Sequence, residues 1–247
     1  MEKWKQASFI SVIAIFAALG IVSDSFSWLF QDLSSVWRSW IFIIEPINGI
    51  LLIPPASFFS TIIGVLVGHS VFFRGNAEFI FTMGAPIGAA VTSFLFRRKW
   101  KIPMIYFIVL LGAYFLTPVS WKLPFWGMWD VYLAFGCLIL MVVIMIRWKN
   151  LWSTQPTGIN LIVIIALSAF IGLEADVLFR IFILVPGQTY HIIYGLSVEQ
   201  LQAWWAVGAV ETSIKASLST IVSIVIVPSV LRAVQRMRSR SSLKGTG

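Results

Sequence analysis

Eight apolar runs divide this chain, and no long hydrophilic segment separates them. An α-helix needs about 20 apolar residues to cross the hydrocarbon core of a bilayer. Hydrophobic residues make up 59% of the 247 residues and charged residues only 11%, whereas a soluble domain has about 25% charged residues. The sequence therefore predicts an all-α, polytopic transmembrane bundle of about eight helices, which forms a single integral membrane domain over residues 1–247. The predicted spans are 6–23, 40–54, 57–73, 79–97, 102–121, 126–146, 158–184 and 203–231.

The second and third runs are short, and Pro54 and Pro55 separate them. Two interpretations stay open. The runs are either two thin or tilted helices, or a re-entrant pair beside six full spans. Neither interpretation changes the side on which the later spans begin. The first run, residues 6–23, is long for a signal peptide, and no A-x-A cleavage site follows it. We therefore expect it to be a retained first span.

Lysine and arginine residues predict the orientation. With eight spans and a cytoplasmic N-terminus, 13 of the 18 basic residues lie on the inner side, as the positive-inside rule expects. Both termini are then cytoplasmic. These inner residues are Lys3, Lys5, Arg97, Arg98, Lys99, Lys101, Arg147, Lys149, Arg232, Arg236, Arg238, Arg240 and Lys244.

The net charge of +8 is concentrated at the ends of the apolar runs. The last segment, residues 232–247, is expected to be a basic cytoplasmic tail beside the anionic lipids of the inner leaflet. Nucleic-acid binding by this tail is the less favoured alternative, so we expect membrane lipid and no nucleic acid as a partner. Two histidines and one cysteine are too few for the usual ligand set of a structural zinc site. We expect neither a metal nor another cofactor.

Ionisable side chains occur inside several predicted spans, where each costs several kcal/mol unless it is paired or hydrated. With the topology above, all of them fall in the outer half of the membrane. This one-sided distribution predicts a polar cavity that opens to the outside. The residues are Glu45, His69, Asp130, Glu174, Asp176, Arg180, Glu211 and Lys215.

Structural roles compete with ligand binding for these residues. Asp176 and Arg180 are four residues apart, as are Glu211 and Lys215, so each pair is also compatible with an ion pair within one helix. For neither pair does the sequence decide between the two roles.

The other ionisable residues have alternatives of their own. Glu45 precedes Pro46, so we expect a non-helical backbone there, with Glu45 capping a break. His69 beside Gly68 is typical of a packing residue, and Asp130 also fits a solvated position at the headgroups. Glu174 has no obvious local partner and is the strongest candidate for ligand binding.

A stripe of small residues marks one face of the first helix, because its members are spaced at i, i+4, i+7 and i+11. Such a stripe lets another helix approach closely. Gly64 and Gly68 form a similar G-x-x-x-G pattern in the third run. The residues of the first stripe are Ala7, Ser11, Ala14 and Ala18.

The sequence lacks the common catalytic motifs, H-E-x-x-H and G-x-S-x-G among them, and it has no P-loop for ATP hydrolysis. We therefore predict that the protein is not an enzyme. A secondary transporter that works alone stays open, as does a carboxylate-dependent enzyme acting on lipid. The favoured class is a membrane receptor for a small molecule.

Four segments carry a resemblance to a known family. They are SVIAIFAALGIVSD, EPINGILLIPPASFFSTIIGVLVGH, MGAPIGAAVTSFLFRRKWK and ETSIKASLSTIVSIVIVPSVLRAV, about half of the chain. They resemble the first to fourth helices and the last helix of the substrate-binding S component of energy-coupling-factor (ECF) transporters. Two features differ: that family typically has six helices, and its G-P-x-x-G turn corresponds here to I-P-P-A.

The resemblance implies a prokaryotic plasma-membrane subunit that captures a vitamin-like molecule at the outer face and delivers it inward. A transmembrane coupling protein and cytoplasmic ATPase subunits are the implied partners. Ala14 and Ala18 are then the docking surface for the coupling protein. A pocket with acidic and basic groups suits a zwitterionic or polar substrate. The predicted substrate-binding residues are Glu45, Asp130, Glu174, Asp176, Arg180, Glu211 and Lys215.

Overall fold

The computed structural model describes residues 2–25, 39–73, 75–147 and 158–244, and no strand occurs among them. The predicted all-α class is therefore confirmed for these residues. The α-helices are α1 (Glu2–Ser25), α2 (Ile41–Leu51), α3 (Pro54–Val71), α4 (Gly84–Phe96), α5 (Lys101–Leu116), α6 (Trp129–Arg147), α7 (Gly158–Leu184), the short α8 (Thr189–Ile192) and α9 (Val198–Lys244). Three 3₁₀ segments connect them: η3 (Asn76–Phe81), η4 (Pro118–Lys122) and η5 (Phe125–Met128).

Each of the eight predicted spans corresponds to one of the longer helices. Five helical segments of the described chain are long and apolar enough to cross a membrane: Pro54–Val71, Glu78–Phe96, Phe125–Arg147, Gly158–Leu184 and Val198–Ala233. Three shorter apolar helices cover Phe9–Ser25, Ile41–Leu51 and Lys101–Leu116. At 1.5 Å per residue, α2 is about 16 Å long, roughly half of the hydrocarbon thickness. The protein is a multi-pass helical membrane protein, and the count of eight crossings stays a prediction.

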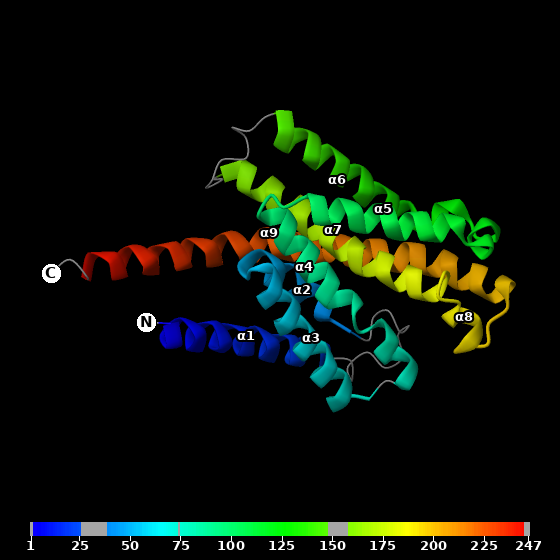
Figure 1. The fold of residues 1–247 in the computed structure, drawn as a ribbon, viewed down its shortest axis with the longest axis horizontal. Helices are drawn as coiled ribbons and strands as arrows, with labels where there is room; N and C mark the ends of the chain where they lie inside the picture. The colour runs from blue at the N-terminus through cyan, green and yellow to red at the C-terminus, as the bar shows by residue number, and fades with distance from the viewer. Residues whose placement is uncertain (1, 26–38, 74, 148–157, 245–247) are drawn as a thin grey trace.

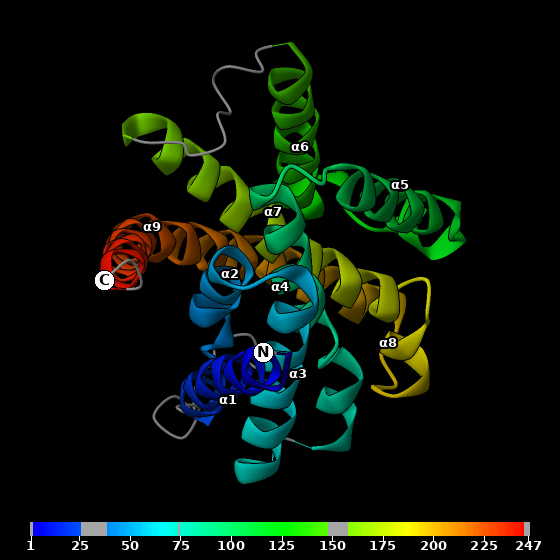
Figure 2. The same ribbon diagram turned by 60° about the vertical axis from the view of Figure 1, so that its left-hand side comes forward.

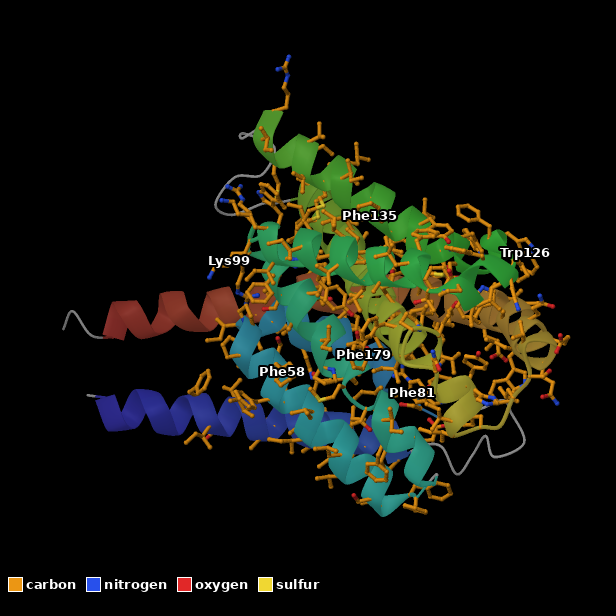
Figure 3. The ribbon with its side chains drawn as sticks, turned by 45° about the vertical axis from the view of Figure 1, so that its right-hand side comes forward. Phe58, Phe81, Lys99, Trp126, Phe135 and Phe179 are labelled. Atoms are coloured by element: carbon orange, nitrogen blue, oxygen red, sulfur yellow. The ribbon has the colours of Figure 1, made fainter. Side chains whose placement is uncertain are left out.

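Successive long helices run in opposite directions, so α1 begins and α9 ends at the same end of the molecule (Figure 1). Lys99 lies at this end, here called the basic end, and Trp126 lies at the opposite end (Figure 3). Residues 232–244 of the predicted basic tail continue helix α9, and residues 245–247 lie outside the described chain. The cytoplasmic position of the termini stays a prediction.

The expectation of a non-helical backbone at Glu45 is wrong, because Glu45 and Pro46 both lie inside α2. Pro46 has no N–H, so the carbonyl of Phe42, four residues earlier, lacks its usual helical partner. The hydroxyl of Ser219 on α9 donates a hydrogen bond to this carbonyl at 2.6 Å. A tertiary hydrogen bond thus replaces the missing helical one, which explains how α2 contains a proline.

Helices α2, α4 and α7 lie at the centre of the bundle (Figure 2), where glycines let their backbones meet. A Cβ atom on Gly172 of α7 would lie 2.9 Å from the carbonyl oxygen of Gly88 on α4. A Cβ atom on Gly49 of α2 would lie 2.5 Å from the Cβ of Thr92. Both distances are too short for a real side chain, so these crossings need glycine. Small residues at such crossings are the usual means of helix association in membranes.

Helices α1 and α3 make a second glycine crossing. A Cβ atom on Gly64 would lie 3.1 Å from the Cα of Gly20, and one on Gly68 would lie 2.6 Å from the carboxylate of Asp24. Ala17 is also buried on this face of α1. The predicted packing role of the G-x-x-x-G pattern in the third run is therefore confirmed.

The side chain of Arg97 connects the basic ends of α2 and α4. Its guanidinium donates to the carbonyl oxygens of Gly49 at 3.2 Å and Ile50 at 3.3 Å. It also donates to the hydroxyl of Ser93 at 2.8 Å, and this hydroxyl donates to the carbonyl of Leu52 at 2.7 Å. The last carbonyls of a helix have no partner within the helix, and here α4 supplies the partners for α2.

The central glycine crossing predicts that one alanine substitution destabilises the protein and that a second does not. Gly172→Ala is expected to lower the thermal stability of the detergent-purified protein by about 1–3 kcal/mol, because the new methyl group overpacks the α4–α7 contact. Gly112→Ala on α5 is the matched control, since a Cβ atom there meets nothing within 4 Å. Thermal unfolding measures both, and equal losses would contradict the close crossing.

The bond from Ser219 to Phe42 predicts a coupling between two distant positions. Ser219→Ala leaves a buried carbonyl without a partner and is expected to cost about 1–3 kcal/mol. Pro46→Ala supplies the missing N–H, so Ser219→Ala should cost less in that background. Ser217→Ala is the control, because the exposed Ser217 hydroxyl bonds within its own helix, to the carbonyl of Ser213. Equal costs of Ser219→Ala in both backgrounds, measured by thermal unfolding, would contradict this explanation.

Candidate functional site

Two adjoining cavities lie toward the end of the bundle opposite to the basic end, where Figure 3 labels Phe81 and Trp126. The larger, here called the aromatic cavity, has a volume of about 220 Å³ and lies among η3, η5, α6, α7 and α9. The smaller, here called the charged cavity, has a volume of about 100 Å³ and extends toward α2 and α3. The residues that line both are Glu78, Phe81, Val177, Arg180 and Thr212.

Four aromatic side chains form much of the wall of the aromatic cavity. The rings of Phe81 and Tyr194 are stacked with 6.4 Å between their centroids, and Trp204 meets Tyr194 edge-on at 5.8 Å. Trp205 stacks in parallel on Tyr114 at 5.9 Å and is only 6% exposed. The cavity thus combines flat ring faces from α9, η3 and the segment before α9.

Gly127 makes the position of the Trp205 indole possible. A Cβ atom at Gly127 would overlap the indole ring of Trp205. Trp204 and Trp205 are neighbours on one helix, so they point to different sides. Trp204 is accordingly exposed, whereas Trp205 is buried.

Asp130 lies at the start of α6, lines the aromatic cavity and is only 1% exposed. Its Oδ1 atom accepts from the backbone N–H of Val131 at 2.9 Å. The hydroxyls of Thr212 and Ser213 lie 2.5 Å and 3.2 Å from its Oδ2 atom. The alternative of a solvated position at the headgroups is therefore wrong. Its predicted contact with a ligand stays a prediction.

Asp176 and Arg180 form the ion pair that their spacing on α7 allows. The guanidinium donates two hydrogen bonds, from Nε to Oδ1 at 2.7 Å and from the second nitrogen to Oδ2 at 3.0 Å. Gly84 on α4 leaves space for Asp176, because a Cβ atom on Gly84 would overlap the Asp176 carboxylate. The side chain of Arg180 is 40% exposed and lines both cavities. Its positive charge is neutralised by the carboxylate of Asp176.

Glu45 and Glu174 are fully buried deeper in the bundle. None of their four carboxylate oxygens has a hydrogen-bond partner among the described residues. Glu45 lies one turn after Ile41, which lines the charged cavity, and the absence of a side chain on Gly88 leaves room for it. Glu174 lies one turn before Val177, on the face of α7 that lines the aromatic cavity. Both carboxylates therefore lie just below the cavities.

Lys215 lines the charged cavity, and its ammonium lies 4.9 Å from the centre of the Phe42 ring. Such a contact between a cation and an aromatic face is attractive. Glu211 lies one turn earlier on α9 and is half-buried. The predicted ion pair between Glu211 and Lys215 stays a prediction.

The sequence did not predict the pair formed by Asp24 and His69. His69 Nδ1 lies 2.9 Å from the carboxylate of Asp24 and 2.9 Å from the carbonyl oxygen of Val65. The hydroxyl of Ser39 donates to the other oxygen of Asp24 at 2.5 Å. Both partners are buried. The glycine pattern of α3 is the sequence feature that indicates this contact, because Gly68 leaves space for Asp24.

Ala14 and Ala18 are exposed on α1, on a different face from the one that packs against α3. Ser11 is exposed as well, and the side chain of Ala7 lies outside the described part. The packed face contains Ala17 and Gly20 instead. The small stripe therefore does not serve packing within the described chain, and docking of a partner there stays a prediction.

The ion pair on α7 predicts a strong coupling between its members. Arg180→Met is expected to destabilise the protein, because Asp176 loses two hydrogen bonds, each worth about 1.5–3 kcal/mol. Asp176→Asn combined with Arg180→Met should be less destabilised than Arg180→Met alone. Lys122→Met, at an exposed lysine of the same end, is the control. Thermal unfolding of the four proteins of a double-mutant cycle measures the coupling, and additive losses would contradict it.

Searches against models of protein families, curated proteins and solved structures give no match to this chain. A fold of this kind does not by itself define a function. The function is therefore inferred from the chemistry of the cavities and of the exposed helix faces.

Proposed function

We propose that the protein is the membrane-embedded substrate-binding subunit of an ECF-type importer. The observation that carries this proposal is the pair of adjoining cavities at the end opposite to the basic residues. If the basic end is cytoplasmic, as the positive-inside rule indicates, these cavities lie on the outer side. They are then placed to capture a small molecule before it is carried inward.

The chemistry of the cavities supports small-molecule binding. Pockets for small ligands are mostly apolar and contain a few polar groups that orient the ligand. The aromatic cavity has this composition, with aromatic walls and the buried carboxylate of Asp130. The proposed substrate-binding residues that line one or both cavities are Asp130, Asp176, Arg180 and Lys215. Glu45 and Glu174 lie below them and support the site from the bundle centre.

The proposed partners are a transmembrane coupling protein and two cytoplasmic ATPase subunits in a prokaryotic plasma membrane. The sequence has no P-loop of its own, so an ATP-driven cycle needs separate ATPases. Ala14 and Ala18 offer the coupling protein a small, exposed face on α1. Small faces of this kind allow close approach between helices in lipid.

A second candidate is a secondary transporter that works alone. The buried carboxylates of Glu45 and Glu174 favour it, because unpartnered carboxylates inside a membrane bundle are typical of proton relays. The two candidates differ in what they require. Uptake by the purified chain in liposomes, driven by a proton gradient without ATPases, would support the secondary transporter and contradict the importer subunit.

The docking face predicts the effect of a double substitution on α1. Ala14→Trp combined with Ala18→Trp is expected to abolish co-purification of a coupling protein co-expressed with this chain, because two indoles prevent the close approach of its helix. Binding of small molecules to the cavities should stay unchanged. Affinity purification and ligand binding by calorimetry measure the two properties separately.

The matched control is Ile15→Trp combined with Leu19→Trp. These residues have the same spacing on α1 and are also exposed, at 60% and 48%, but they lie on a neighbouring face. Co-purification should survive in this control. If the Ala14 and Ala18 variant retains the coupling protein as well as the control does, α1 is not the docking helix.

A further inference from the structure

The charges around the aromatic cavity do not balance. Asp130 and Glu78 line it, and the only cation among the described residues that line it is Arg180, which donates two hydrogen bonds to Asp176. The partners of Asp130 among the described residues are two hydroxyls and one backbone N–H, all of them neutral. The lysine at position 215 lines the charged cavity and not this one. The aromatic cavity therefore has an excess of negative charge.

The walls of this cavity favour the same kind of ligand. The faces of aromatic rings carry partial negative charge and attract cations, most strongly when the site is shielded from water. Phe81, Tyr194, Trp204 and Trp205 supply four such rings. Three of them come from the segment 194–205, so one stretch of chain provides most of the ring surface.

Beside the cavity, one hydrogen-bond donor has no partner among the described residues. The indole nitrogen of Trp205 is buried and has no acceptor among the described residues. A buried donor without an acceptor is unfavourable, and the Trp205 side chain is held in place by stacking on Tyr114. Because this nitrogen has almost no accessible surface, Trp205 contributes a ring to the cavity wall and no donor to a ligand.

We propose that the aromatic cavity binds a small organic cation with a flat ring. This inference rests on the proposed substrate-binding function and names its substrate class. The cavity volume is about 220 Å³, and an apolar cavity of about 150 Å³ already holds benzene. A single six-membered ring with one or two short substituents fills such a space. The cation lies near Asp130 and the aromatic side chains of the wall.

Three probes of nearly the same shape test the charge. They are 1-methylnicotinamide, which is a flat cation with an amide acceptor, nicotinamide, which is neutral, and nicotinate, which is an anion. Isothermal titration of the full chain in detergent measures their affinities. We expect the cation to bind at least about tenfold more tightly than the neutral probe, a difference within the range of desolvated cation–aromatic contacts. Nicotinate should bind most weakly.

Two variants assign the effect to residues. Asp130→Asn keeps the shape and one acceptor oxygen, and it should remove most of the preference for the cation over nicotinamide. Trp205→Phe keeps an aromatic ring in the wall, so the preference for the cation should remain. Glu199→Gln is the matched control, because it removes an exposed carboxylate from the same end of the molecule without touching the cavity. Thermal unfolding confirms that each variant is folded.

Equal affinities for the three probes, tighter binding of nicotinate, or no saturable binding of the cation at millimolar concentration would overturn the inference. A preference for the cation that survives Asp130→Asn would also overturn it. The importer function fails differently, through loss of partner capture or through uptake without ATPases. Cation binding by a chain that captures no coupling protein would thus support the proposed cation site and contradict the proposed importer function.

Discussion

The close crossing of α4 and α7 at Gly88 and Gly172 is the contact on which the rest of the structure depends. In lipid, apolar helices gain little by leaving their surroundings, so association relies on tight packing and on hydrogen bonds. The two backbones meet where neither residue has a side chain. The same absence of a side chain on Gly88 leaves room for the Glu45 carboxylate from α2. The two glycines therefore allow α2, α4 and α7 to meet, with the Glu45 carboxylate at their centre.

Helix positions followed well from the sequence, because the apolar runs are long and are separated by proline, glycine or charged residues. The proline pair at positions 54 and 55 marks the start of α3, where a missing N–H costs nothing. Pro46 wrongly predicted a break in α2. The helical hydrogen bond that it removes is replaced by the hydroxyl of Ser219, 173 residues later in the chain. No local sequence pattern reveals such a partner.

The candidate site was only partly predictable. The ionisable residues inside apolar runs pointed to the region where the two cavities lie, since such groups rarely occur in a membrane without a role. Their individual environments depend on tertiary contacts. The burial of Asp130 follows from hydroxyls on α9, and the cavity wall at Trp205 follows from the space at Gly127. The small-residue pattern on α1 showed a similar limit, because Ala17 and Gly20 pack against α3 while Ala14 and Ala18 face outward.

The attachments of α2 have a mechanical consequence. Arg97 holds the carbonyls at one end of this short helix, and Ser219 holds the carbonyl of Phe42 near its other end. Sliding of α2 along its neighbours would break the hydrogen bonds at both of its ends at once. Displacement of α2 relative to α4 and α9 is thus disfavoured.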